Sequence, residues 1–405
     1  MLCLAAFHPA PSSAREIAPA RGGAPLLRGV EHAKRTVVAT VVDVGRIDTY
    51  GYGATFAVER DLATETPGAG ETLRVGWEEM VPFRPARFRK DERVLVALEA
   101  LPGYSLWRQR FPNGNAFAVA ELGTAFLRDP DDASITSLAR YLRIDPSERE
   151  QAPGIEALAG IVEVAAAPLA EGAATRLGEI PGLGSKLRQP AAAALGAAIE
   201  NEARQDDLRR TLIRLAAAHR LDGMREWIAR VAEAGPPLAG EAWAALLAID
   251  GSLPVETVER LLGSADPGVR AVAVRASVAT PQATRALKLA RSDPASEVRI
   301  AVVETLVSAQ SPGSLEVGYA ALFDRDPPVR VAAAEAVGKL GAEVVPHLRE
   351  LALARSGRDA NGPLGALAFA GAEGQGVLFE LSQTHPDENT RGQARLLLGL
   401  DPRKH

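Results

Sequence analysis

The chain has 405 residues, with 46 basic and 51 acidic side chains and a formal net charge of -5 at pH 7. A chain of this length suggests two or three domains, and 47% apolar with 24% charged residues is typical of a folded globular protein. The acidic balance excludes a global basic field that attracts nucleic acid, the single cysteine excludes a disulfide framework, and no apolar run is as long as a membrane span.

Composition divides the chain into a β-rich front and a helical back. Of the 19 aromatic residues, 13 lie before residue 151, whereas alanine is concentrated after it. Aromatic residues favour strands and alanine favours helices. The 40 arginines against six lysines indicate GC-rich coding DNA, so the abundance of arginine by itself says nothing about function. The predicted fold class is therefore a multidomain α and β protein.

Residues 1–33 predict a signal-like or disordered leader. The short apolar run Leu2–Phe7 is followed by small residues and proline, which resembles the end of a secretory signal, although no basic residue precedes it. Residues 15–33 contain several glycines and prolines and are expected to be a flexible leader. Export to the periplasm or the medium is favoured, and a disordered tail on a cytoplasmic protein is the alternative.

Residues 34–128 predict a small β-barrel or sandwich domain, with an OB-like barrel as the preferred fold. Alternating and β-branched segments lie between Gly- and Pro-rich turns, as is typical of strands in such domains. A short helical turn is expected near residues 78–81. The expected strands are 35–44, 54–60, 71–77 and 93–98, followed by a hairpin of 104–111 with 116–122 around Asn113-Gly114.

Basic and aromatic residues alternate within this domain and form a candidate site for single-stranded nucleic acid or another ligand. Aromatic rings stack on bases, and guanidinium groups attract the phosphate backbone. Acidic neighbours such as Asp91 and Glu92 oppose this field, so a solvated loop with its aromatic rings in the barrel core is the preferred interpretation. The candidate residues are Arg84, Arg87, Phe88, Arg89, Lys90, Trp107, Arg108 and Arg110.

Residues 129–205 predict a helical linker or degenerate repeats, and residues 206–405 predict about seven helical hairpins. The strongest signal is a self-similar Asp-Pro-x-x-Arg-like segment, whose arginines recur 29, 31 and then 61 residues apart. Aspartate is suited to cap a helix that begins with proline. The repeated residues are Asp266, Arg270, Asp293, Arg299, Asp326, Arg330 and Arg391.

These segments resemble the HEAT-repeat family in its short bacterial form, most specifically over residues 260–340. The resemblance implies an α-solenoid, in which stacked helix pairs bury their apolar faces against neighbours, and usually a protein-interaction scaffold. It also implies that the Asp and Arg residues bond within and between repeats rather than forming a ladder for phosphate. Some members of the family are lyases or glycosylases, so an enzyme of that type is an alternative.

No catalytic constellation is recognised in the sequence. The six histidines are too far apart for a helical metal pair, and a nucleophile elbow and a dinucleotide glycine motif are both missing. We therefore expect a non-catalytic protein without a cofactor, whose solenoid docks a protein partner; nucleic acid is not favoured, and the oligomeric state is left open. For the enzyme alternative, the candidate groove residues are Trp227, Trp243 and Tyr319.

Overall fold

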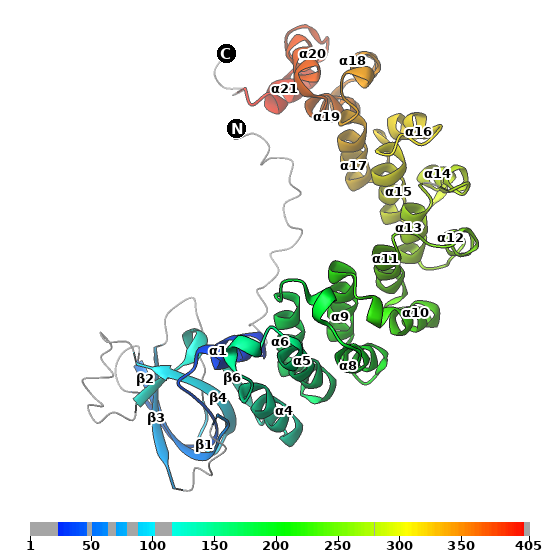
Figure 1. Ribbon diagram of the computed structural model, residues 1–405. Helices are drawn as coiled ribbons and strands as arrows, with labels where there is room; N and C mark the ends of the chain where they lie inside the picture. Colours follow the sequence, from blue (N-terminus) through cyan, green and yellow to red (C-terminus); the bar gives the residue numbers. More distant parts are fainter. Residues whose placement is uncertain are drawn as a thin grey trace. The chain divides into compact units, whose positions relative to one another are not determined.

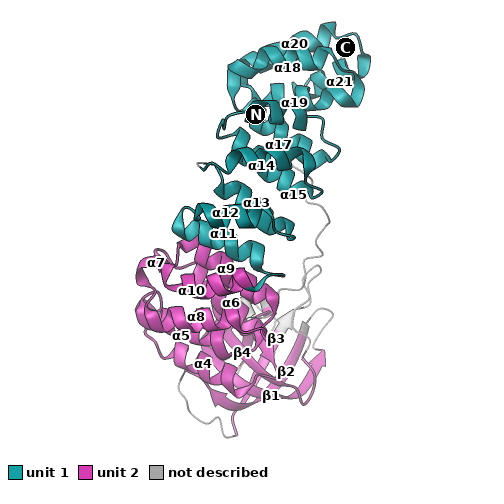
Figure 2. Cartoon of the chain, turned by 90° about the vertical axis from the view of Figure 1, so that its right-hand side faces the viewer, with its two compact units in different colours: residues 1–14, 234–405 teal, residues 15–233 magenta. Residues whose placement is uncertain are grey.

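The computed structural model describes residues 23–46, 51–63, 70–78, 88–101, 116–278 and 280–400. These residues fall into two compact units that meet in the sequence between residues 233 and 234 (Figure 2). The first unit combines a β-barrel with helices α4 to α10, and the second unit is entirely helical. Within the described ranges, no helix has the length and apolar character needed to cross a bilayer.

The first unit begins with helix α1, Gly23–His32, where the sequence predicted a flexible leader; for these residues that prediction is wrong. Leu26, Leu27 and Val30 are buried on one face of α1, which packs against helix α6 (Ala167–Gly178) and the barrel. Gly29 allows the close approach to the barrel, since a Cβ there would lie 2.5 Å from the Ala125 side chain. The helical spacing of the apolar residues therefore decides the structure of this segment, despite the glycines and prolines beside it.

Five strands close into a barrel, which confirms the predicted β-barrel. Neighbouring strands are antiparallel except for the parallel pair β3–β5, and pairing of β1 with β4 closes the ring. The number of strands agrees with the OB type. A short sixth strand pairs antiparallel with residues 94–96 of β4. The strands are β1 Arg35–Arg46, β2 Gly51–Asp61, β3 Thr72–Glu78, β4 Arg93–Ala100, β5 Ala116–Val119 and β6 Phe126–Arg128.

The barrel core is built from alternate positions on the strands. Phe56, Leu73 and Val75 point inward and are almost completely buried. Strand β4 differs, because residues 94–98 are all fully buried; one face lines the barrel and α1 packs against the same strand. The predicted hairpin is only partly described: residues 104–111 lie outside the described ranges, and the predicted strand 116–122 ends at Val119, after which Ala120–Gly123 forms the helical turn α3. The helical turn expected near 78–81 also falls largely outside them.

After the barrel, the first unit continues as packed helices. Asp131 caps α4 by accepting a hydrogen bond from the Ser134 amide at 2.6 Å. Helix α5 packs against α4, α6 and α8, so residues 129–205 form a helical array that adjoins the barrel. The helices are α4 Asp132–Leu142, α5 Ala152–Val164, α6 Ala167–Gly178, α7 Leu183–Lys186, α8 Gln189–Glu200, α9 Asp206–His219 and α10 Arg225–Ala234, with 3₁₀ turns at Pro146–Glu148 and Asp222–Met224.

The second unit is a two-row array of helices, which confirms the predicted α-solenoid. Each odd-numbered helix from α11 to α19 packs against the next odd-numbered helix, and these form an inner row along the curved array (Figure 1). The inner row consists of α11 Ala239–Asp250, α13 Pro267–Ala276, α15 Ser296–Val302, α17 Pro327–Gly338, α19 Asn361–Phe369 and α21 Glu388–Leu397. The outer row consists of α12 Val255–Leu262, α14 Ala283–Ser292, α16 Ser314–Ala321, α18 Val345–Leu353 and α20 Gly371–Thr384.

Apolar residues from both rows form a continuous core in this unit. Val329, Leu348, Leu364 and Leu378 come from four successive helices and are fully buried in one cluster. Helix α15 continues into a π-helical turn at Val303–Val307, which also packs against α17. Because each helix pair is covered by its neighbours, the stability of the array depends on packing between adjacent repeats.

Candidate functional site

The structure describes three of the eight candidate ligand residues of the barrel, namely Phe88, Arg89 and Lys90. Phe88 is only 5% exposed and packs edge-on against Phe56 and Phe126, with ring centroids 5.0 and 5.2 Å apart. Its ring is part of the barrel core and is closed to a base, so the assignment of Phe88 to a stacking platform is wrong. Arg89 and Lys90 are exposed at the turn before β4. Arg84, Arg87, Trp107, Arg108 and Arg110 lie outside the described residues.

Several arginines on the described part of the barrel are paired with carboxylates. Arg35 donates two hydrogen bonds to Glu71, at 2.6 and 2.9 Å, and one to Asp61 at 2.9 Å. The hydrogen bonds from Arg35 hold the pKa of Glu71 below its ordinary value. Arg93 pairs with Glu59, and Arg128 with Glu92. These pairs reduce the positive field available to an anionic ligand.

Acidic and arginine side chains also join helix α1 to the helical array of the first unit. The hydroxyl of the fully buried Tyr141 donates to Glu31, and Arg176 donates to Glu31 and Glu150, both at 3.0 Å. Burial, together with the bond to Glu31, raises the pKa of Tyr141. The hydroxyl therefore remains a hydrogen-bond donor. No local pattern in the sequence predicts this cluster, because Glu31 lies 110 residues from Tyr141.

We expect Tyr141→Phe to lower the free energy of unfolding of the first unit by about 1–2 kcal/mol, because the buried carboxylate of Glu31 loses one donor. Urea unfolding followed by circular dichroism measures this change. Tyr319→Phe is the matched control, since the Tyr319 ring is only partly buried and packs against His347 at 4.3 Å. Equal stability of Tyr141→Phe and the wild type would contradict the assigned hydrogen bond.

A pocket of about 230 Å³ lies between α1 and α6, next to this cluster. Its charged groups are already engaged: Glu31 with Arg176, and Arg28 with Glu121 at 3.7 Å. The pocket therefore offers no charge that calls for a ligand. It is lined by Leu27, Arg28, Glu31, His32, Gly172, Thr175, Arg176 and Glu179.

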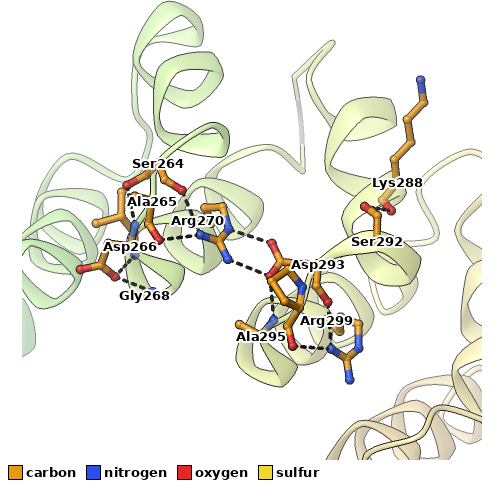
Figure 3. A network of polar contacts seen from close by, with 12 residues as sticks. Ser264, Ala265, Asp266, Gly268, Arg270, Lys288, Ser292, Asp293, Ala295 and Arg299 are labelled. Atoms are coloured by element: carbon orange, nitrogen blue, oxygen red, sulfur yellow. Dashed lines mark hydrogen bonds and ion pairs between the residues drawn. The ribbon is translucent and has the colours of Figure 1, made fainter.

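The repeated arginines of the second unit form two bidentate ion pairs between adjacent repeats, and Figure 3 shows the first of them, between Arg270 and Asp293. The Nε and Nη2 atoms of Arg270 donate to the Asp293 carboxylate at 2.7 and 2.8 Å. The same atoms of Arg299 donate to Asp324, both at 2.9 Å, and Nη2 also donates to Asp326. Each pair joins the first turn of one inner-row helix to the loop that precedes the next. We call this series of contacts the arginine ladder.

Each ladder arginine also binds its own loop. The Nη1 atom donates to the carbonyl oxygens of the residues six and five positions earlier in the chain, a contact that we call the carbonyl clamp. The clamp recurs at Arg270, Arg299, Arg330 and Arg391. It fixes the guanidinium plane and satisfies carbonyl groups at the start of the helix.

The three Asp-Pro pairs of the sequence are not structurally equivalent. Asp266 caps α13 by accepting hydrogen bonds from the amides of Gly268 and Val269, as the sequence predicted. Asp326 stands at the start of α17 without such a bond, and Asp293 lies two residues further upstream relative to its arginine. Asp293 accepts bonds from Arg270 and the Ala295 amide, and α15 begins only at Ser296. Asp-Pro pairs that look alike in the sequence therefore have different structural roles: Asp266 caps a helix, whereas Asp293 accepts the ion pair from the preceding repeat.

The ladder makes the second unit sensitive to acid. Burial acts to raise the pKa of Asp293 and of Asp324, but the bonds from Arg270 and Arg299 outweigh it and hold both values below the ordinary 3.8. A lowered pKa in the folded state stabilises the fold above the ordinary value, and this contribution is lost as the pH falls through the folded-state value.

We expect the helical signal to fall as the pH decreases from about 4 towards 2. The double variant Asp293→Asn/Asp324→Asn should be less stable at pH 7 and should lose less further stability on acidification. Thermal melts at a series of pH values, monitored at 222 nm by circular dichroism, measure both effects. The same change in melting temperature with pH in the variant and the wild type would contradict this origin of the acid sensitivity.

The aromatic residues proposed for an enzyme groove take part in helix packing. Trp243 is 6% exposed and lies beneath Arg260 at 5.5 Å, and Trp227 packs so closely against α8 that a Cβ on Gly196 would lie 2.2 Å from its ring. Among the residues that the structure describes, no three His, Cys, Asp or Glu side chains gather as metal ligands.

Helix pairs stacked in two rows and joined by a repeated ion pair define an α-solenoid. Residues 283–361, which run from α14 to the start of α19, match the family model described as HEAT repeats. This part of the helical array therefore matches HEAT repeats in sequence as well as in architecture. No curated protein matches the chain.

Proposed function

We propose that the protein is a non-catalytic scaffold whose helical array docks a protein partner along the inner row of the second unit. HEAT repeats form a helical scaffold that is commonly used for protein interaction. The array holds its backbone rigidly through the ladder and a continuous core, which leaves the outward side chains of the inner row available for recognition.

The observation that carries this proposal is a column of side chains on the inner row. The fifth residue after each ladder arginine is Arg275, Glu304, Glu335 and Leu396, and each is exposed or partly exposed. The column therefore changes from charged to apolar towards α21, where Leu396 is 52% exposed. Val331, on α17, is a further exposed apolar residue of this row, with 39% exposure. Apolar side chains exposed among charged ones suit a protein interface, whose apolar centre is surrounded by a polar rim.

The proposal is tested by affinity capture with the full chain as bait, followed by mass spectrometry. We expect the double variant Val331→Asp/Leu396→Asp to lose the captured partner, because it introduces charge into the apolar part of the column. Phe379→Asp is the control, since Phe379 is 58% exposed on the outer-row helix α20. Loss of the partner with Phe379→Asp, and its retention with the double variant, would overturn the proposed surface.

Binding of single-stranded nucleic acid by the barrel is the second candidate function, and it now depends on Arg89, Lys90 and the residues outside the described ranges. Electrostatic binding to a nucleic acid weakens steeply as salt increases. A filter-binding titration at two salt concentrations, with the wild type and Arg89→Gln/Lys90→Gln, measures it. Binding that does not change with salt or in the variant would reject this candidate.

We also propose that the protein is exported, on the basis of the apolar and small residues at positions 2–14. Mass spectrometry of the N-terminal peptide from fractionated cells tests this. A shortened N-terminus in the periplasm or medium is the expected result, and an intact Met1 in the cytosolic fraction would reject export.

A further inference from the structure

Arg330 differs from the two ladder arginines before it. Its Nη1 atom forms the carbonyl clamp with Asp324 and Arg325, at 2.7 and 3.1 Å, as Arg270 and Arg299 do in their own loops. Its Nε and Nη2 atoms, however, have no hydrogen-bond partner among the described residues. In Arg270 and Arg299 these are the two atoms that bind a carboxylate.

The next repeat explains why no internal carboxylate reaches Arg330. The connection into α19 forms a 3₁₀ turn at Gly357–Ala360, and Gly357 has a left-handed φ of 59°. The Gly357 amide donates to Asp387 and Thr390 of the last repeat, at 3.1 and 3.0 Å. The turn is thus bound to the last repeat. Its one carboxylate, Asp359, is exposed and makes no ion pair with Arg330.

The open side of Arg330 is already oriented for a ligand. The carbonyl clamp fixes the plane of the guanidinium group, so the two remaining N–H groups form a rigid fork, and the side chain is partly exposed. A fixed fork of this kind binds a carboxylate through two parallel hydrogen bonds. The same fork holds an aspartate in each of the two preceding joints, which shows that this geometry suits a carboxylate.

Arginines outnumber unpaired carboxylates in the surrounding loops, where Asp359, beside Arg358, is the one acidic side chain without an ion pair among the described residues. Arg325 precedes Arg330 in the same loop and is 69% exposed at its side chain. Arg355 lies over the ring of Phe323 at 5.1 Å, and both Arg355 and Arg358 are exposed. The nearby carboxylates of Asp324 and Asp326 are held by Arg299. This edge of the array therefore attracts an acidic partner.

We propose that Arg330 binds the carboxylate of an aspartate or glutamate side chain of a partner protein, in place of the internal aspartate that the two preceding joints contain. The inference rests on the proposed scaffold function and specifies the chemistry of the partner. Arg325, Arg355 and Arg358 strengthen the attraction for further acidic residues of the same partner segment.

The test uses the full-length chain and an immobilised library of random dodecapeptides, followed by fluorescence anisotropy with the best ligands. We expect the retained peptides to be rich in Asp and Glu, and their affinity to fall about tenfold or more in Arg330→Gln. Arg330→Lys keeps the charge but loses the fork, so it should lose most of the affinity as well. Arg291→Gln removes an exposed arginine of α14 and should change the affinity less than about twofold.

Circular dichroism shows whether each variant is folded. If Arg330→Gln does not fold, Arg330→Lys takes its place in the test, because its ammonium group can still donate to the loop carbonyls. Retention of acidic peptides with unchanged affinity in both variants would overturn the inference. The inference would also be overturned if acidic peptides did not bind at concentrations on the order of 1 mM, or if only phosphoserine forms of the peptides bound. If the inner-row variants still abolish partner capture in these cases, the proposed scaffold function stands and only the role of Arg330 fails.

Discussion

Replacing Arg299 by alanine lowers the free energy of unfolding of the second unit by about 3–5 kcal/mol, the usual cost of removing one partner from a buried ion pair. The Arg299 side chain is 3% exposed and that of Asp324 is 11% exposed, so the remaining carboxylate has little access to water. The variant also loses the carbonyl clamp with Asp293 and Pro294, at 2.9 and 3.2 Å. Thermal and urea unfolding, followed by circular dichroism, measure this loss.

The control for this experiment is Arg285→Ala. Arg285 pairs with Glu259 at 3.3 Å, but the two side chains are 50% and 57% exposed. An exposed pair contributes about 0–1 kcal/mol, so the control should be close to the wild type. If Arg299→Ala were no less stable than Arg285→Ala, the ladder would be a consequence of the packing and not one of its causes.

A methyl group at Gly362 destabilises the second unit by about 2–3 kcal/mol, because there is no space for it between α19 and the preceding repeat. A Cβ at this position would lie 2.2 Å from the carbonyl oxygen of Leu322, a backbone atom that moves only with its helix. Gly362→Ala therefore forces the two repeats apart. Differential scanning calorimetry measures the expected fall in melting temperature.

Gly365 on the same helix is the matched control. A Cβ there would meet the Ala334 side chain at 3.4 Å, which is an ordinary contact. Since alanine is a better helix former than glycine, Gly365→Ala should be neutral or stabilising by about 0.5–1 kcal/mol. Equal melting temperatures for the two variants would contradict the close approach of Gly362 to the carbonyl oxygen of Leu322.

The sequence predicts those parts of the fold that are determined by local pattern. The recurring arginines mark the first turns of α13, α15, α17 and α21, and the Asp266 cap forms as expected. Residues 93–98 form a strand because β-branched and aliphatic residues favour it there. Both the barrel and the solenoid therefore follow from periodicity and turn chemistry.

Contacts between residues far apart in the chain could not be predicted in the same way. The sequence placed aspartates near the arginines, but the bidentate partner of Arg270 is Asp293 of the following repeat, 23 residues later. Leu26, Leu27 and Val30 have the spacing of a buried helix face, but nearby glycine and proline obscured that pattern. These residues are covered by α6, which is distant in the chain: Glu31 of α1 and Arg176 of α6, which are hydrogen-bonded, lie 145 residues apart. Such partners are selected by the tertiary fold.

The position of the arginine ladder has a mechanical consequence. Its ion pairs recur at the first turns of the inner-row helices, so a pulling force along the array is resisted most strongly at that edge. The joint after Arg330 has no ion pair of the ladder among the described residues, and its inner row relies on the glycine-mediated contact of α17 with α19, where a Cβ at Gly338 would lie 2.3 Å from the Ala366 carbonyl oxygen. In the outer row of the same joint, Arg349 on α18 pairs with Glu380 on α20. Contact packing loses its strength over a very short extension, so a stretched molecule should open at this joint along the inner row before the outer row.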